Sequence, residues 1–426
     1  MVACRNIYIF CIGVTLSSFF VLPAYRPAGI PLSYIVLGII FVAGFFWGFR
    51  LSMREKVAFF LWTLVMVYVF LHSIFFSSPF VLSHAAISLA GIVMGMIILS
   101  FIQTERDLIL FIFGCAPLMV ADSITALGQI FNIVWSREIG QVLATNDVAL
   151  SEYLHQLGTG SVWGLQFHAH GYAIDQVVWS FFVFCALFSL KRARKQTYFT
   201  IWLIFFIGCL GVYVSFMRSA VWSFFPFVLG LSILRLPKFP VRSIAVVLGV
   251  AVIFFSFINL QALSDSEAIS DSEAISGFPT GLKRTQRIFR FMVAFYDSER
   301  VEMFQEAARV IKKDPFLGRA YSEYSLEKSI HNGVLNGWAR FGLPWLLLSL
   351  VASTFTIYSI LWNRQHIRPW FKLVALSMIL LIFAQVMTHT LTPGKCDWII
   401  PISLGFLLAF LNINSNALQI AGQHEF

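Results

Sequence analysis

The chain has 426 residues, of which 58% are hydrophobic and only 12% are charged. Soluble proteins are about 45–50% apolar and about 25% charged. One globular core could not bury this much apolar surface, and the charge needed to cover several soluble domains is absent. The composition excludes a water-soluble globule and predicts a protein whose main solvent is the lipid bilayer.

Apolar stretches of about 20 residues, long enough to cross the hydrocarbon layer, recur along the whole chain. We expect an all-α polytopic membrane protein of about twelve transmembrane helices. The first stretch is followed by another span and not by a cleavage site, so we interpret it as a retained helix and not as a signal peptide. The expected spans cover residues 7–22, 30–49, 57–76, 80–102, 108–131, 171–190, 198–216, 219–234, 243–261, 343–362, 371–391 and 397–412.

Basic residues predict the orientation of these spans. Alternating the spans from a cytoplasmic N-terminus places four basic clusters on one side, which is typical of cytoplasmic loops. These clusters are Arg50/Arg54/Lys56, Lys191/Arg192/Arg194/Lys195, Arg235/Lys238/Arg242 and Arg364/Arg368/Lys372. The opposite short loops hold Arg26, Arg137, Arg218 and Lys395. Both termini are expected in the cytoplasm, and the net charge of +9 is interpreted as a topology signal and not as a nucleic-acid footprint.

This topology divides the chain into four parts. Residues 1–261 hold spans one to nine with an external loop at 132–170, and residues 262–342 form a large extracytoplasmic loop. Residues 343–412 hold the last three spans, and 413–426 form a cytoplasmic tail. Function is expected in the two long external loops. The larger one opens with a tandem repeat at 264–275 that is polar and low in complexity, which indicates a spacer.

A first helix is predicted in the large loop at residues 281–296. Lys283, Arg284, Arg287 and Arg290 would cluster on one side of it, opposite apolar residues. Such a helix would lie in the outer interface, with its cations toward anionic head groups or a lipid-linked phosphate. A generic interfacial anchor is the alternative.

A second helix is predicted at residues 297–313, ended by Asp314 and Pro315. Its expected apolar stripe is Val301, Phe304, Ala308 and Ile311. Arg300 falls in the first turn, where a guanidinium beside free backbone N–H groups is suited to bind an anion. A local ion pair with neighbouring carboxylates is the alternative.

One motif bears most directly on function. A P-x-x-G segment precedes a His-Asn pair, and a G-x-P step then leads into the next span. The residues concerned are Pro315, Gly318, His331, Asn332, Gly342 and Pro344. This order and spacing resemble the hallmark of the O-antigen ligase and polymerase superfamily. The sequence departs from that pattern at Arg340, where many members carry an acidic residue, and at Val334, where an aromatic residue is common.

Two arginines extend the resemblance. Arg218 lies in a Ser-x-x-Arg turn between the seventh and eighth spans, and Arg300 heads the loop helix. The family transfers a glycan from a polyprenyl diphosphate to a sugar hydroxyl, which requires a neutralised leaving group and a deprotonated acceptor. By this resemblance, Arg218 and Arg300 clamp the diphosphate, Arg284 and Arg287 attract it, and His331 acts as the base.

In the same assignment Asn332, Gly318, Gly342 and Pro344 support the site. No metal and no cofactor are expected, because fixed arginines can neutralise the diphosphate. The pair His168 and His170 lacks partnering carboxylates and is a weak metal signal. The aromatic residues Trp135, Tyr153, Trp163 and Phe167 of the first external loop are expected either to stack on sugar rings or to anchor the interface.

The leading hypothesis is a polymerase of lipid-linked repeat units in a bacterial cytoplasmic membrane. A ligase that moves a finished polymer to a lipid A core is the alternative within the enzymes. A lipid-linked sugar flippase is less favoured, because only Asp122 and Asp175 fall within spans and the halves show no internal repeat. Expected partners are the polyprenyl-linked oligosaccharide, an acceptor glycan or glycolipid and the bilayer, with a chain-length regulator and a flippase as further candidates, and no nucleic acid.

Overall fold

The structure of the chain is a computed structural model. The residues that it describes are 2–22, 32–49, 51–76, 81–131, 133–143, 150–151, 162–166, 169–190, 194–215, 298–318, 333–361, 369–388 and 393–423, with isolated positions between 220 and 231 and at 367.

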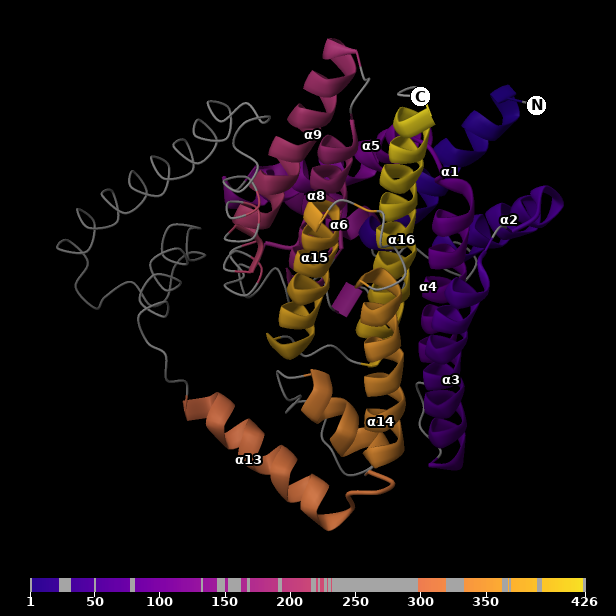
Figure 1. Cartoon of the computed structure of the whole chain (residues 1–426). Coiled ribbons are helices and arrows are strands. Elements are labelled where there is room, and N and C mark those ends of the chain that lie inside the picture. The colour runs from indigo at the N-terminus through magenta and orange to yellow at the C-terminus, as the bar shows by residue number, and fades with distance from the viewer. Residues whose placement is uncertain are drawn as a thin grey trace.

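About 90% of the described chain is helical and none of it is strand, which confirms the predicted all-α class. The helices pack as a bundle, from which α13 projects at one end (Figure 1). They are α1 (Val2–Val21), α2 (Leu32–Trp47), α3 (Met53–Phe75), α4 (Val81–Phe101), α5 (Glu105–Ile130), α6 (Val134–Leu143), α8 (Ala169–Ser189), α9 (Lys195–Val214), α13 (Ser298–Lys313), α14 (Gly333–Leu361), α15 (Pro369–Thr388) and α16 (Pro393–Gln423).

Six of the described helices are long and apolar enough to cross a membrane: α1, α3, α5, α8, α9 and α14. Four shorter apolar segments lie in α2, α4, α15 and α16. Ten of the expected spans therefore coincide with described helices. The expected span 219–234 is described only at isolated positions, and the span 243–261, the tandem repeat and the helix at 281–296 lie outside the described residues.

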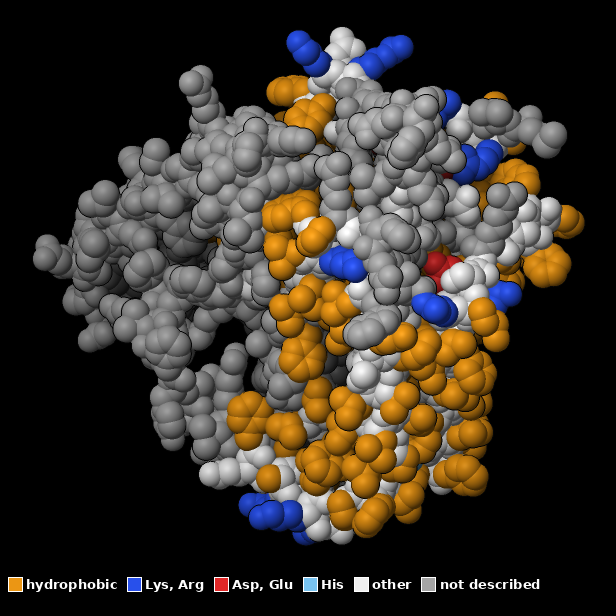
Figure 2. Space-filling view, viewed as in Figure 1, with side chains coloured by type: hydrophobic (Ala, Val, Ile, Leu, Met, Phe, Trp, Pro, Cys, Tyr) orange, Lys and Arg blue, Asp and Glu red, His pale blue; other side chains and the backbone are white. Residues whose placement is uncertain are grey.

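On the face shown in Figure 2, apolar side chains form a broad patch over the lower part of the bundle. Phe45 and Phe46 of α2 are 71% and 84% exposed, and Phe75 of α3 is 81% exposed. A water-soluble protein rarely exposes contiguous apolar surface on this scale. The surface is that expected of helices that face lipid.

At the centre of the bundle, α8 is buried on all sides from Gly171 to Ser189. A helix that is apolar around its whole circumference is suited to such a place. The ring of its Phe182 stacks on Phe406 of α16, with centroids 3.9 Å apart.

The paired helices α1 and α5 run parallel and touch backbone to backbone. At their starts Arg5 binds Asp107 through two hydrogen bonds of 2.7 Å. Further along, a Cβ added at Gly13 would lie 2.9 Å from the nitrogen of Cys115 and 3.0 Å from the Cα of Gly114. Small residues permit this close approach, which is the usual way in which membrane helices associate.

The helices α3 and α14 run antiparallel. Trp62 of α3 donates to the hydroxyl of Thr356 at 3.2 Å, and Tyr68, further along α3, donates to the carbonyl of Phe341, earlier in α14, at 2.7 Å. The C-terminal part of α3 therefore lies beside the first residues of α14. Figure 1 shows α13 at this same end of the bundle, opposite the start of α1 and the end of α16.

The described residues of the segment 132–170 pack against α5. They include a helix, α6, and residues 162–166, which are buried. Asp122 accepts from the N–H of Leu165 at 2.7 Å and from the side chains of Gln166 and Gln176 at 3.3 and 3.0 Å. A buried carboxylate thus satisfies the backbone of a buried loop.

This packing corrects one expectation about the aromatic residues. Trp163 is fully buried beneath the surface, so the prediction that it stacks on a sugar is wrong. The amide of Gln129 accepts from the N–H groups of Trp163 and Gly164 at 3.0 and 3.1 Å and so holds the loop inward. Trp135 is 47% exposed, and Tyr153 and Phe167 lie outside the described residues.

The structure confirms the extent of the predicted loop helix, α13, but a different face of the helix is buried from the one predicted. Phe304 and Ala308 are exposed, so the predicted apolar stripe is partly wrong. The buried residues are Ala307 and Val310, which pack with Ala339 of α14. The contact with α14, which the sequence of α13 alone does not show, selects the buried face.

Candidate functional site

The site begins at the turn that ends α13, residues 314–318. The carboxylate of Asp314 accepts from the N–H of Leu317 at 3.2 Å, and its carbonyl accepts from the N–H of Gly318 at 3.2 Å. Gly318 has φ = 68°, a conformation that side chains with a Cβ rarely adopt. An aspartate, a proline and a glycine in this order therefore produce a tight turn directly after the helix.

The second part of the site is a break inside α14. Gly342 has φ = 77° and ψ = −174°, a region that glycine alone occupies. Residues 333–341 form a separate helical segment, and Pro344 falls in the first turn of the following one, where its missing N–H costs little. The predicted span from 343 coincides with the second segment, and residues 333–341, which the sequence analysis places at the end of the large loop, are helical.

The turn and the break touch through their backbones, and we call this contact the junction. The N–H of Leu343 donates to the carbonyls of Pro315 at 3.0 Å and Phe316 at 3.2 Å. A Cβ added at Gly318 would lie 2.6 Å from the nitrogen of Gly342. The structure thus brings together the predicted motif residues Pro315, Gly318 and Gly342.

Side chains of α14 and α3 add further hydrogen bonds to the junction. The indole of Trp338 donates to the carbonyl of Pro315 at 3.1 Å. From α3, Tyr68 donates to Phe341 and His72 to Leu317. Sequence reasoning did not identify Tyr68 or His72, although a polar residue inside an apolar span was a signal available for His72.

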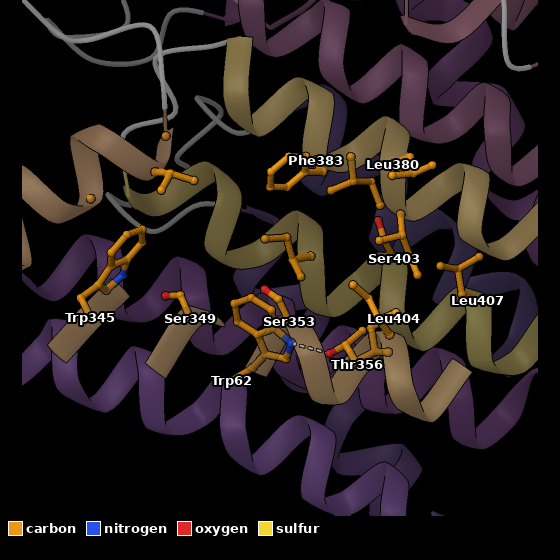
Figure 3. A pocket seen from close by; sticks show the side chains of 17 residues that line it. Trp62, Trp345, Ser349, Ser353, Thr356, Leu380, Phe383, Ser403, Leu404 and Leu407 are labelled. Carbon is orange, nitrogen blue, oxygen red and sulfur yellow. Dashed lines mark hydrogen bonds between the residues drawn. The ribbon is translucent and has the colours of Figure 1, made fainter. Parts of the chain in front are cut away.

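A cavity of about 380 Å³ begins beside the junction and continues between α3, α14, α15 and α16 (Figure 3). Its volume lies in the usual range for small-molecule sites, about 300–1,000 Å³. The first segment of α14 contributes Gly333 and Gly337, and α15 contributes Leu380 and Phe383. The lining is mostly apolar, so the cavity is suited to a hydrocarbon chain.

A row of hydroxyls crosses this apolar lining. Ser349, Ser353 and Thr356 lie along one side of α14, facing Trp62 of α3 (Figure 3). Trp345 lies against Gly337, where any Cβ would overlap its ring. The break at Gly342 therefore folds the first segment of α14 back over the start of the second.

Two polar side chains of the first segment of α14 are buried. Asn336 and Arg340, one turn apart, are each 1% exposed. Within the part of the chain that the structure describes, neither amide atom of Asn336 has a hydrogen-bond partner. Sequence analysis noted Arg340 only as a departure from the family pattern, and nothing in the sequence indicated the burial of Asn336.

The other predicted site residues are described only in part. Arg300 lies in the first turn of α13, about 20 Å along the helix from Asp314, so the structure does not bring it to the junction. Its side chain lies outside the described part, as do Arg218, Arg284, Arg287, His331 and Asn332. Within the described chain, no group of three or more His, Cys, Asp or Glu side chains could hold a metal ion.

No family model matches this sequence, and no curated protein matches it. The resemblance to the O-antigen ligase and polymerase superfamily therefore depends on the motif residues themselves.

Replacing Gly342 with alanine should destabilise the protein by about 1–3 kcal/mol from backbone strain and a further 1–3 kcal/mol, roughly, from overpacking against the turn. Gly48→Ala is the matched control, because Gly48 has φ = 75° but no atom within 4 Å of an added Cβ. The measurement is the thermal unfolding midpoint of both purified variants in detergent. Equal midpoints for the two variants would contradict the contact at the junction.

Proposed function

We propose that this protein transfers a glycan from a polyprenyl-diphosphate carrier to a sugar hydroxyl on the outer face of a bacterial cytoplasmic membrane, polymerising repeat units of a surface polysaccharide. It is a metal-independent membrane glycosyltransferase in this proposal. Two observations support this proposal: the resemblance of the motif to the family, and the contact between the segment with Pro315 and Gly318 and the segment with Gly342.

The observation that carries the proposal is the junction. Pro315 and Gly318 lie on one segment and Gly342 on another, yet they meet through hydrogen bonds and backbone contact. Both glycines have torsions that other residues avoid. Residues that are separated in the sequence but meet in this way are suited to define a site, and His331 and Asn332 lie on the stretch of chain between them.

The cavity suits the lipid part of such a donor. It is mostly apolar, lies among helices that include α3 and α14, both long and apolar enough to cross a membrane, and has Gly333 among its lining residues. His331 precedes Gly333 by two residues, so covalent geometry keeps their Cα atoms within about 7.6 Å. A polyprenyl chain in the cavity would therefore hold its diphosphate within reach of the His-Asn pair.

The reaction needs one proton transfer and one displacement. The acceptor hydroxyl gives its proton to His331 as its oxygen bonds to the anomeric carbon of the donor. The bond from that carbon to the diphosphate breaks, and the electron pair leaves with the diphosphate, whose charge Arg218 and Arg300 would neutralise. Attack opposite the leaving group inverts the anomeric configuration.

The twelve-span topology belongs to the same proposal, with both termini in the cytoplasm and the loop of α13 outside. It is supported by the opposite placement of α13 and the chain ends in the bundle (Figure 1). It is also supported by the antiparallel packing of α3 and α14, expected for the third and tenth spans.

A transporter is less well supported. Asp122 is fully buried, and its carboxylate accepts from Leu165, Gln166 and Gln176. A carboxylate engaged in this way holds a loop in place and has few acceptor positions left for a passing ion. Polymerase and ligase are not distinguished by any described contact, so the assay below separates them.

Replacing His331 with alanine should lower the transfer rate about 10²–10⁴-fold, the usual contribution of a general base, while donor binding is kept. The assay uses purified protein in lipid nanodiscs with a polyprenyl-linked repeat unit. The wild-type rate should fall below pH 6.5 or so, near the unperturbed pKa of histidine, because a protonated base cannot accept the proton.

Arg218→Ala and Arg300→Ala should also lose transfer, with partial rescue by lysine, which lacks the planar fork. Arg309→Ala is the control on α13, since Arg309 is exposed and pairs with Glu306 of its own helix at 2.9 Å. A product ladder from donor alone indicates a polymerase, whereas product only with a lipid A core indicates a ligase. A wild-type rate in His331→Ala would refute the base assignment.

Single cysteines at Ser272 and Gln365 in a cysteine-free background should react from opposite sides of the membrane. An impermeant maleimide added to intact cells should label position 272 alone, and position 365 only after the membrane is opened. Equal labelling of both in intact cells would contradict the topology.

A further inference from the structure

Two residues of α3 each donate a hydrogen bond to a different side of the junction. The hydroxyl of Tyr68 donates to the carbonyl of Phe341 at 2.7 Å, at the end of the first segment of α14. Nε2 of His72 donates to the carbonyl of Leu317 at 2.6 Å, in the turn after α13. Residues four apart share one face of a helix, so a single face of α3 binds both parts of the motif.

These bonds reach carbonyls at or beyond the ends of helical segments. The last carbonyls of a helical segment lack partners in that segment, and the non-helical torsions at Gly342 end the segment at Phe341. Leu317 lies in a turn and not in a helix. Where water is scarce, an unsatisfied carbonyl is costly, so a donor from a neighbouring helix fixes where each segment can lie.

The imidazole of His72 is set in one orientation. It is only 5% exposed, and its ring lies edge-on to Phe341 with centroids 5.3 Å apart and beside Phe76 at 4.5 Å. A carbonyl can only accept, so the proton is on Nε2. Nδ1 is buried and has no hydrogen-bond partner among the described residues, which is compatible with the neutral ring acting as a single donor.

We infer that Tyr68 and His72 are positioning residues for the transfer reaction: they hold the turn and the break of α14 in one arrangement and so fix the segment that begins at Gly333, two residues after His331 in the chain. This inference rests on the proposed function. A displacement of about 1 Å in a catalytic group can cost roughly 10²-fold in rate.

The test compares Tyr68→Phe, His72→Leu and His72→Gln in the nanodisc assay. The first two remove one donor each, whereas glutamine keeps an N–H donor of similar reach. We expect kcat to fall at least tenfold in Tyr68→Phe and His72→Leu. A loss of this size corresponds to a displacement of the catalytic group by a fraction of an ångström. The KM for donor should stay within about twofold, since the cavity is intact, and His72→Gln should recover most of kcat.

The matched control is Thr63→Val on the same helix, because the hydroxyl of Thr63 bonds the carbonyl of Phe59 within α3. It should keep the wild-type kcat. Rates are normalised to the amount of folded protein, because a residue that only supports the fold would lower that amount and leave the normalised kcat and the KM unchanged. If His72→Leu does not accumulate in the membrane, Tyr68→Phe, which removes one oxygen, decides alone.

A double-mutant comparison separates this inference from the proposed function. If Tyr68 acts through His331, adding Tyr68→Phe to His331→Ala should lower the residual rate no further. A full additional loss in the double variant, or wild-type kcat in both Tyr68→Phe and His72→Leu while His331→Ala is inactive, would overturn the inference alone. Full activity of His331→Ala would overturn the base assignment in the proposed function.

Discussion

The site depends on one contact between two stretches of backbone. At the junction, the turn that ends α13 meets the break in α14, and neither Gly318 nor Gly342 leaves room for a side chain. Both residues also have positive φ, so steric space and backbone conformation require glycine at the same two positions. The first segment of α14, the cavity wall that it forms and the chain that leads into it all take their position from this contact.

The break in α14 explains why the junction needs several hydrogen bonds. A broken helix leaves N–H and C=O groups without partners in their own segment, and where they are buried each must find a partner elsewhere in the protein. The N–H of Leu343 is satisfied by the turn, and the carbonyls of Phe341 and Leu317 are satisfied by α3. The hydrogen bonds that join the turn after α13 to α14 thus also supply partners for the backbone groups that the break in α14 leaves unpaired in its own helix.

Much of the fold follows from local sequence, whereas the site depends on contacts between distant segments. Apolar length predicted ten of the described helices, and Asp314 with Pro315 correctly marked the end of α13. The buried face of α13 was misassigned because α14, and not the periodicity of α13, selects it. Trp163 was expected at the surface because nothing local shows that Asp122, a residue of α5, binds its loop.

We propose that a polyprenyl-diphosphate donor binds in the cavity beside the junction. A donor analogue with a photoreactive diazirine on its isoprenoid chain tests this directly, with adducts located by mass spectrometry. Binding in the cavity predicts adducts on the cavity residues Trp345 and Phe383, lost when unlabelled donor competes. Adducts that gather instead on lipid-facing residues such as Phe45 and Phe46, and that resist competition, would contradict it.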